Sequence, residues 1–241
     1  MNNYIDNSYG YDTAIQAENE LTLQRYIAGV MRKVYGKMTL GLLVTALTSY
    51  LVLSSESLMT LFFTNSLSFF LLAGLELGVV IYLSARIGKL SSGTATALFY
   101  AYSVLNGITL TPIFLIYTGT SIVMTFAITA GMFGAMTLAG YFTRTDLSKF
   151  GAFMFMALIG LIVCMIVNLF LHSSMMAWCI SVAGVLIFVG LTAWDTQAIK
   201  RMCAEADPSM LGKVATMGAL TLYLDFINLF IHLLRILGSR N

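Results

Sequence analysis

Three carboxyl groups stand inside long apolar runs of this chain: Glu76, Asp195 and Asp225. A charged group in hydrocarbon is costly, so each carboxyl group needs a partner or an aqueous cavity, and each is a functional candidate. The competing interpretation is structural, with each acid neutral and hydrogen-bonded to a neighbouring helix. Three acids in so few apolar runs favour function over that interpretation.

The last apolar run also carries a stripe of polar residues. Its members are spaced 4, 3, 4 and 3 residues apart, which places them on one face of a helix; they are Thr221, Asp225, Asn228, His232 and Arg235. We expect this face to line a central cavity that leads to the outer surface. Together with Glu76, the pore-lining candidates are Thr221, Asn228 and His232. The alternative is a stripe used only for helix packing.

Asp195 and Asp225 lie at equal distances in sequence from a predicted bend. The midpoint between them is residue 210, beside Asp207-Pro208-Ser209, and proline restricts both its own backbone and that of the preceding residue. A helical hairpin about this bend places both carboxyl groups roughly 22 Å from its tip. Two carboxyl groups in contact in a low-dielectric site cannot both ionise cheaply, so they are expected to share a proton. Such a pair is a pH-sensitive latch.

When both acids are ionised, they form an oxygen-rich site suited to a hard cation. Asp195 and Asp225 are therefore candidate calcium ligands as well as the candidate pH sensor. Arg86, at the cytosolic end of the second span, is the nearest candidate countercharge. Its alternative role is that of an ordinary basic anchor beside the membrane.

The elements that position these acids must be membrane-spanning helices. Of 241 residues, 59% are hydrophobic and only 10% are charged, and the mean hydropathy is +0.86. A soluble domain carries about a quarter charged residues. Uncharged runs of about twenty residues cross a bilayer as helices, because lipid cannot satisfy an open backbone. The net charge of +2 forms no dense basic cluster, so no nucleic-acid partner is expected.

Seven spans are predicted within an all-α integral membrane protein. They cover residues 34–53, 67–87, 94–116, 121–142, two spans within 150–194 separated at 172–174, and 214–237. Residues 1–33 are expected to form a polar cytosolic segment, and residues 34–241 the seven-helix membrane domain. Three cysteines have no metal or redox spacing and are interpreted as apolar helix residues: Cys164, Cys179 and Cys203.

The distribution of lysine and arginine predicts the orientation. Eleven of the 13 basic residues lie before or at the start of the first span, or at the connections between spans two and three, four and five, or six and seven. This excess marks the cytosolic side, so the N-terminus is predicted there and the C-terminus outside. Arg235 and Arg240 are the two exceptions. They leave open a six-span alternative in which the last segment is re-entrant.

Three stretches of the chain resemble the transmembrane Bax inhibitor motif family. They are Ala193-Trp194-Asp195-Thr196-Gln197-Ala198-Ile199, Leu222-Tyr223-Leu224-Asp225-Phe226-Ile227-Asn228-Leu229-Phe230 and Asn106-Gly107-Ile108-Thr109-Leu110-Thr111-Pro112-Ile113. The resemblance extends from about residue 25 to the C-terminus. It implies a seven-helix bundle with the seventh helix central.

The resemblance also implies a function. Members of the family are described as pH-sensitive calcium leak channels, in which Asp195 and Asp225 match the di-aspartyl pH sensor. Arg86 matches the latch arginine in a loose register, and Glu76 matches an acidic position of the same helix. The expected partners are the lipid bilayer, calcium ions and protons, with no cofactor.

Eukaryotic members suppress cell death and often end in a lysine-rich tail. This chain ends in Gly238-Ser239-Arg240-Asn241, so we expect a bacterial-type member in the cytoplasmic (inner) membrane.

Three other functions compete with the channel. A proton-coupled secondary transporter also uses buried acids, but such proteins often show repeats and broken helices, and only Pro112 interrupts a span here. An intramembrane aspartyl protease uses two aspartates as acid and base. Its Gly-x-Gly-Asp pattern is replaced here by Leu222-Tyr223-Leu224 before Asp225, so no enzyme is expected. A structural membrane scaffold is the third.

Overall fold

The computed structural model describes the backbone of residues 3–241 and the side chains of residues 18–241 except 19 and 66. This part of the chain is helical throughout apart from short connections. In chain order the elements are α1 (Asn3–Leu53), α2 (Glu56–Phe63), α3 (Ser66–Arg86), α4 (Ser92–Ile116), α5 (Gly119–Phe142), α6 (Ser148–Leu171), α7 (Ser174–Glu205), η1 (Pro208–Met210) and α8 (Leu211–Leu237).

Seven of these helices are long and apolar enough to cross a membrane. They are α3 to α8 together with the Glu20–Leu53 part of α1. The predicted seven-span, all-α fold is therefore confirmed. The predicted turns at residues 117–121, 172–174 and 207–209 all coincide with breaks between helices.

Two helix boundaries differ from the sequence-based expectation. The domain boundary at residue 33 falls inside α1, and the division of the chain there stays a prediction. Helix α7 continues to Glu205 instead of ending near residue 194. Its basic residues Lys200 and Arg201 donate hydrogen bonds to the Tyr141 carbonyl in the last turn of α5 and to Ser148 Oγ at the start of α6. The helix can therefore continue past them.

The short helix α2 was not predicted. Helix α1 ends at Leu53, as the predicted span does. Ser55 then caps a new helix by accepting a hydrogen bond from the Leu58 amide. Apolar residues of α2, including Met59 and Phe62, pack against a small cluster of Val52, Leu72 and Ile108. The segment after α1 therefore lies along the bundle as a helix too short to cross a membrane.

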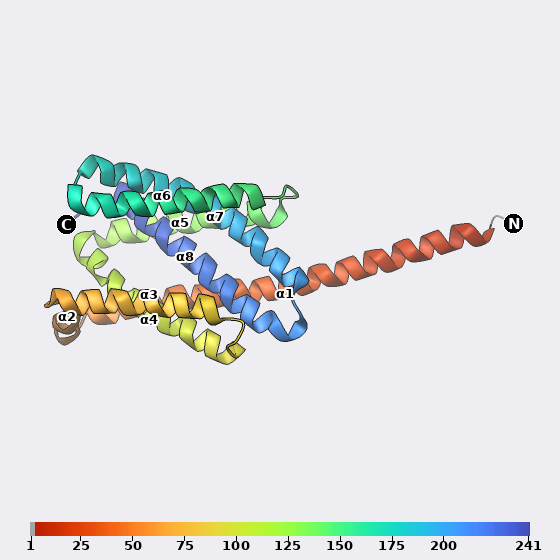
Figure 1. Ribbon diagram of the computed structural model, residues 1–241, viewed down its shortest axis with the longest axis horizontal. Coiled ribbons are helices and arrows are strands. Elements are labelled where there is room, and N and C mark those ends of the chain that lie inside the picture. Colours follow the sequence, from red (N-terminus) through yellow and green to blue (C-terminus); the bar gives the residue numbers. More distant parts are fainter. Residues whose placement is uncertain (1–2) are drawn as a thin grey trace.

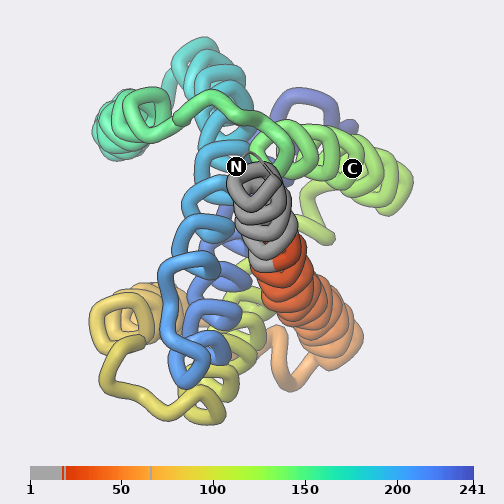
Figure 2. The backbone as a smooth tube through the Cα atoms, turned by 90° about the vertical axis from the view of Figure 1, so that its right-hand side faces the viewer, coloured from red at the N-terminus to blue at the C-terminus, as the bar shows by residue number. Residues whose placement is uncertain are grey.

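Helix α8 occupies the centre of the bundle, as expected. It runs diagonally between the other helices (Figure 1) and contacts α7, α1, α5 and α4. In the end view α7 and α8 cross the middle, with α3 and α4 on one side and α5 and α6 on the other (Figure 2). Most of the buried core residues of the bundle are accordingly those on α7 and α8.

Small residues allow these helices to approach closely. A side chain added at Gly140 of α5 would collide with the backbone of Ala193 in α7, two residues before Asp195. One added at Gly107 of α4 would come within 2.6 Å of the carbonyl oxygen of Thr45 in α1. Glycine at these two positions is what brings the backbones together, the usual device for helix packing in membranes.

The C-terminus lies at the end of the bundle opposite the α7–α8 turn (Figure 1). The Ser239 amide donates to Ser121 Oγ at 3.0 Å, and the Thr118 amide donates to the Ser239 carbonyl at 3.1 Å. The Asn241 amide donates to the Ile116 carbonyl at 3.0 Å. These bonds tie the chain end to the α4–α5 turn. Helix α8 thus crosses the whole bundle, and the re-entrant alternative is not supported.

Candidate functional site

The α7–α8 hairpin brings Asp195 and Asp225 together. Helix α7 ends at Glu205, Pro208 opens the 3-10 turn η1, and α8 returns antiparallel to pack along α7. The two carboxyl groups then lie close enough to interact directly. Equal spacing on both sides of the bend predicted that the two aspartates lie at the same distance from the tip of the hairpin. The structure shows that both side chains also face inward.

The surroundings of the pair are poor in compensating groups. Asp225 is only 4% exposed, and its Oδ2 atom has no hydrogen bond of good geometry among the described residues. Asp195 is partly buried. In the described part of the chain the single ion pair joins Arg201 to Asp146, so neither acid of the pair has a basic partner. The negative charge of these carboxylates can therefore be neutralised by protonation or by a bound cation.

Arg86 is not brought to the aspartates, which corrects the expected latch contact. It is the last residue of α3 and is exposed. Helix α3 packs chiefly on α4 and α2, whereas both aspartates belong to the α7–α8 hairpin. The arginine therefore stands at the end of an outlying helix, in the position of a basic residue beside the membrane.

Glu76 is held by donors from α4. Its Oε1 accepts from Asn106 Nδ2 at 2.6 Å, and its Oε2 accepts from Thr109 Oγ1 at 2.8 Å. Both oxygens of this half-buried carboxyl group are therefore used in joining α3 to α4. Its expected role of lining a pore stays a prediction, and the contacts seen are structural.

A second set of bonds extends this contact into the central helix. The Tyr223 hydroxyl of α8 donates to Asn106 Oδ1 at 2.9 Å and lies 2.6 Å from Thr45 Oγ1 of α1. Thr45 Oγ1 is also 2.9 Å from the Ser103 carbonyl oxygen. Side chains of four helices thus form one network, which we call the Glu76–Tyr223 network. Sequence reasoning did not select Tyr223 or Thr45, because isolated hydroxyl groups in apolar helices give no periodic signal.

The residues of the polar stripe of α8 do not all line one cavity. His232 is only 3% exposed; its ring stacks on Phe188 of α7, with centroids 5.8 Å apart. It also fills the gap above Gly184, where an added side chain would come within 2.5 Å of the ring. Asn228 donates to the Leu224 carbonyl of its own helix. Packing of α7 on α8 buries His232, so no aqueous route reaches it in the described part of this structure, and its expected role of lining a pore stays a prediction.

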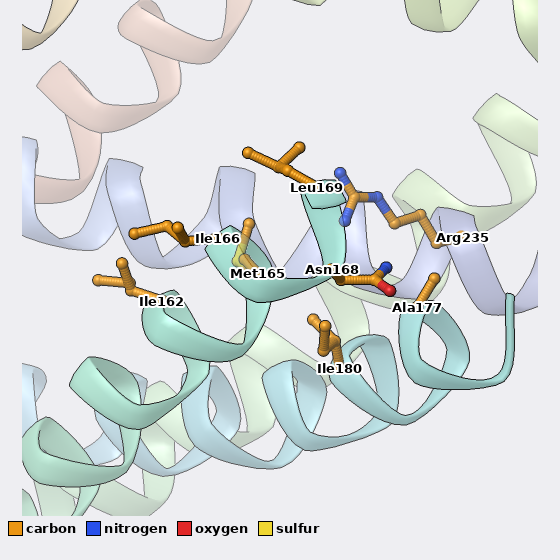
Figure 3. A pocket seen from close by; sticks show the side chains of 8 residues that line it. All are labelled: Ile162, Met165, Ile166, Asn168, Leu169, Ala177, Ile180 and Arg235. Atoms are coloured by element: carbon orange, nitrogen blue, oxygen red, sulfur yellow. The ribbon is translucent and has the colours of Figure 1, made fainter. Parts of the chain in front are cut away.

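At the outer end of α8 the stripe does reach a cavity. A pocket of about 330 Å³ lies between α6, α7 and α8, with Asn168 and Arg235 as its polar residues (Figure 3). Its remaining lining is apolar and includes Ile162, Met165 and Ile180. Arg235 is thus the stripe residue that borders open space, above the buried His232.

Lys37 is a further half-buried polar group, which sequence reasoning counted only as one of the cytosolic basic residues. Its Nζ donates to Thr96 Oγ1 at 2.7 Å and to Thr216 Oγ1 at 2.6 Å. The ammonium group therefore joins α1, α4 and α8 without a carboxylate. In the sequence, Lys37 is recognisable only as a basic residue at the start of an apolar run. That position does not predict its hydrogen-bond partners.

Comparison with known proteins identifies the family of this chain. The family described as "Inhibitor of apoptosis-promoting Bax1" matches residues 27–241, which include α3 to α8 and nearly all of the membrane-spanning part of α1. The chain belongs to the Bax inhibitor-1 family. The resemblance carried by the two aspartate segments and by residues 106–113 is therefore confirmed.

Similar Bax inhibitor family proteins occur in diverse bacteria. "Inner membrane protein YbhL" of Escherichia coli K12 is 51% identical over 221 residues, covering 90% of this chain and 93% of that protein. An uncharacterized protein of Borreliella burgdorferi is 46% identical over 212 residues, covering 87% and 91%. An uncharacterized membrane protein of Streptococcus pyogenes serotype M1 is 37% identical over 232 residues, covering 95% and 99%. The chain is a multi-pass inner membrane protein, like YbhL.

Proposed function

We propose that this Bax inhibitor family member is a pH-sensitive calcium leak channel gated by Asp195 and Asp225. The observation that carries the proposal is the proximity of the two carboxyl groups on the central hairpin, with no basic partner in the described part of the chain. Ionising both would place like charges together in a low-dielectric interior. A proton shared between them therefore holds α7 to α8, and its loss drives the helices apart.

The ionised state then supplies carboxylate oxygens to the permeating ion. Oxygen ligands suit calcium, a hard cation, and both oxygen atoms of Asp225 become available once the shared proton leaves. The same groups thus act as pH sensor and as transient ion ligands. Asp225 belongs to the helix that contacts most of the bundle, so movement at this point is transmitted to α1, α4 and α5.

The test is calcium flux through purified protein in liposomes. Vesicles loaded with a calcium indicator are given an inward calcium gradient at a series of pH values, with the same pH on both sides. A leak channel admits calcium under these conditions, and its rate changes between roughly pH 6 and pH 8. Flux that requires a proton gradient would instead identify a proton-coupled transporter. Protein-free vesicles and the Asp195→Asn variant are the controls.

A further inference from the structure

The ends of α5 and α7 on the predicted cytosolic side enclose a basic pocket of about 430 Å³. Its charged residues are Arg144, Asp146, Lys200 and Arg201, and these four define the basic pocket below. Asp146 is paired with Arg201, whose guanidinium lowers the pKa of the Asp146 carboxyl. Among the described residues, Arg144 and Lys200 have no carboxylate partner, so the pocket is positively charged.

The pocket is built by contacts that hold its basic groups in place. Lys200 Nζ donates to the Tyr141 carbonyl at 2.9 Å and lies 4.8 Å from the centre of the Tyr141 ring. Arg201 donates to Ser148 Oγ at 2.8 Å. Gln197 accepts from the Leu147 amide and donates to the Thr145 carbonyl. The α5–α6 loop is thereby fixed against α7, and the remaining N–H groups of Lys200 are free for a ligand.

An apolar groove of about 540 Å³ continues from this pocket between α1 and α5. Tyr141 lines both spaces, and Met31, Gly36 and Leu138 are among the groove residues. We call this space the α1–α5 groove. Arg32 also lines the groove, so a basic group accompanies its apolar wall.

Two hydroxyl groups belong to the walls of the α1–α5 groove, those of Tyr35 and Thr137. Both hydroxyl oxygen atoms are buried, so the surface that the groove offers to an occupant is chiefly apolar.

We propose that an anionic phospholipid binds here, with its phosphate headgroup in the basic pocket and an acyl chain in the α1–α5 groove. Three observations favour this occupant over a free anion. The charge of the pocket is complementary to phosphate, the apolar groove adjoins it directly, and both lie where helices leave the membrane. Basic side chains at this level attract anionic lipids.

Native mass spectrometry of the delipidated full-length chain tests the proposal. Phosphatidylglycerol and phosphatidylcholine with identical acyl chains are added in parallel, and the lipid-bound fractions are compared. Phosphatidylglycerol should bind more tightly. The Arg144→Gln/Lys200→Gln variant should lose at least about tenfold in phosphatidylglycerol affinity, as expected when two near-surface charges are removed. The matched control is Lys89→Gln/Lys149→Gln, which removes equal charge from exposed positions outside the pocket.

A second variant tests the groove without touching a charge. A Cβ atom added at Gly36, which lines the groove, meets nothing within 4 Å, so we expect Gly36→Leu to occupy the groove without displacing the backbone. It should weaken phosphatidylglycerol binding while the thermal unfolding midpoint is retained. Gly160→Leu, at an equally open and exposed position of α6, should bind lipid like the parent chain.

Three results would overturn the proposal. The first is equal affinity for the two lipids. The second is unchanged phosphatidylglycerol binding in both the Arg144→Gln/Lys200→Gln and the Gly36→Leu variants. The third is displacement of the lipid by millimolar inorganic phosphate, which would assign the pocket to a free anion. None of these readouts depends on calcium flux, so the lipid site and the proposed channel stand or fall separately.

Discussion

The Tyr223 hydroxyl on α8 donates a hydrogen bond to Asn106 Oδ1 on α4, with 2.9 Å between the oxygen atoms. Tyr223 is fully buried and lies two residues before Asp225 in the central helix. Asn106 in turn donates to Glu76 on α3. The helix that carries the buried aspartate is therefore anchored, beside that residue, to the outlying pair α3 and α4.

Removing this anchor should destabilise the bundle. Tyr223→Phe keeps the ring in place but leaves Asn106 Oδ1 buried without its donor, which costs about 1–3 kcal/mol. The thermal unfolding midpoint in detergent should fall. Tyr50→Phe, at a residue 63% exposed on α1, is the control and should leave the midpoint unchanged. Equal midpoints for the two variants would show that the Glu76–Tyr223 network adds no stability.

The aspartate pair should behave as one unit in flux measurements. Asp195→Asn and Asp225→Asn each remove an ionisation while keeping a side chain of similar size. Each single variant should flatten the pH dependence of calcium flux between roughly pH 6 and pH 8. The double variant should resemble either single, a strong departure from additivity. Additive, independent shifts would mean two separate sites, and an unchanged midpoint in both singles would remove the pair from gating.

Packing of His232 against Gly184 should be sensitive to one methyl group. In Gly184→Ala the new Cβ would lie 2.5 Å from the His232 ring, so α7 and α8 must separate or the ring must leave Phe188. Overpacking of this kind costs about 1–3 kcal/mol. Gly134→Ala, which meets nothing within 4 Å, should be neutral or slightly stabilising in the same thermal unfolding assay. A tolerated Gly184→Ala would show that the hairpin interface adapts freely.

Cysteine labelling checks the orientation of the bundle. In a background without Cys164, Cys179 and Cys203, single cysteines replace Ser91 in the α3–α4 connection and Ser239 after α8. Both positions are exposed and lie at opposite ends of the bundle. A membrane-impermeant thiol reagent added to intact cells should label position 239 and spare position 91, because basic residues keep the latter side in the cytosol. The reverse pattern would invert the topology.

Asp146 should oppose lipid binding at its pocket over a wide pH range. Arg201 holds the pKa of this carboxyl below its usual range, so the ion pair is present above the ordinary value of about 4 and is lost only as pH falls through the depressed value. The affinity for phosphatidylglycerol should therefore not change between roughly pH 5 and pH 8. Asp146→Asn should strengthen binding by removing the single acid of the basic pocket. Weaker phosphatidylglycerol binding by Asp146→Asn would contradict the proposal that the pocket binds an anionic headgroup.

Much of this molecule is readable from its sequence, because lipid imposes simple requirements. An apolar run of sufficient length must be a helix, and basic residues mark one side of the membrane. The bend at Pro208 also follows from local backbone chemistry, so equal spacing on both sides of it predicts that Asp195 and Asp225 share a level. These properties depend on position along a helix, which residue counting supplies.

Rotation of each helix about its own axis was decided only by tertiary packing. Spacing along α8 predicts that Asp225 and His232 share a face, but contact with α7 buries His232 under Phe188. The same packing turns Lys37 toward two threonines and leaves Arg86 exposed on α3. In a chain that is apolar on almost every face, hydropathy does not distinguish lipid from protein as the neighbour. Side-chain fit between particular helices makes that distinction, and it arises only when the whole bundle is assembled.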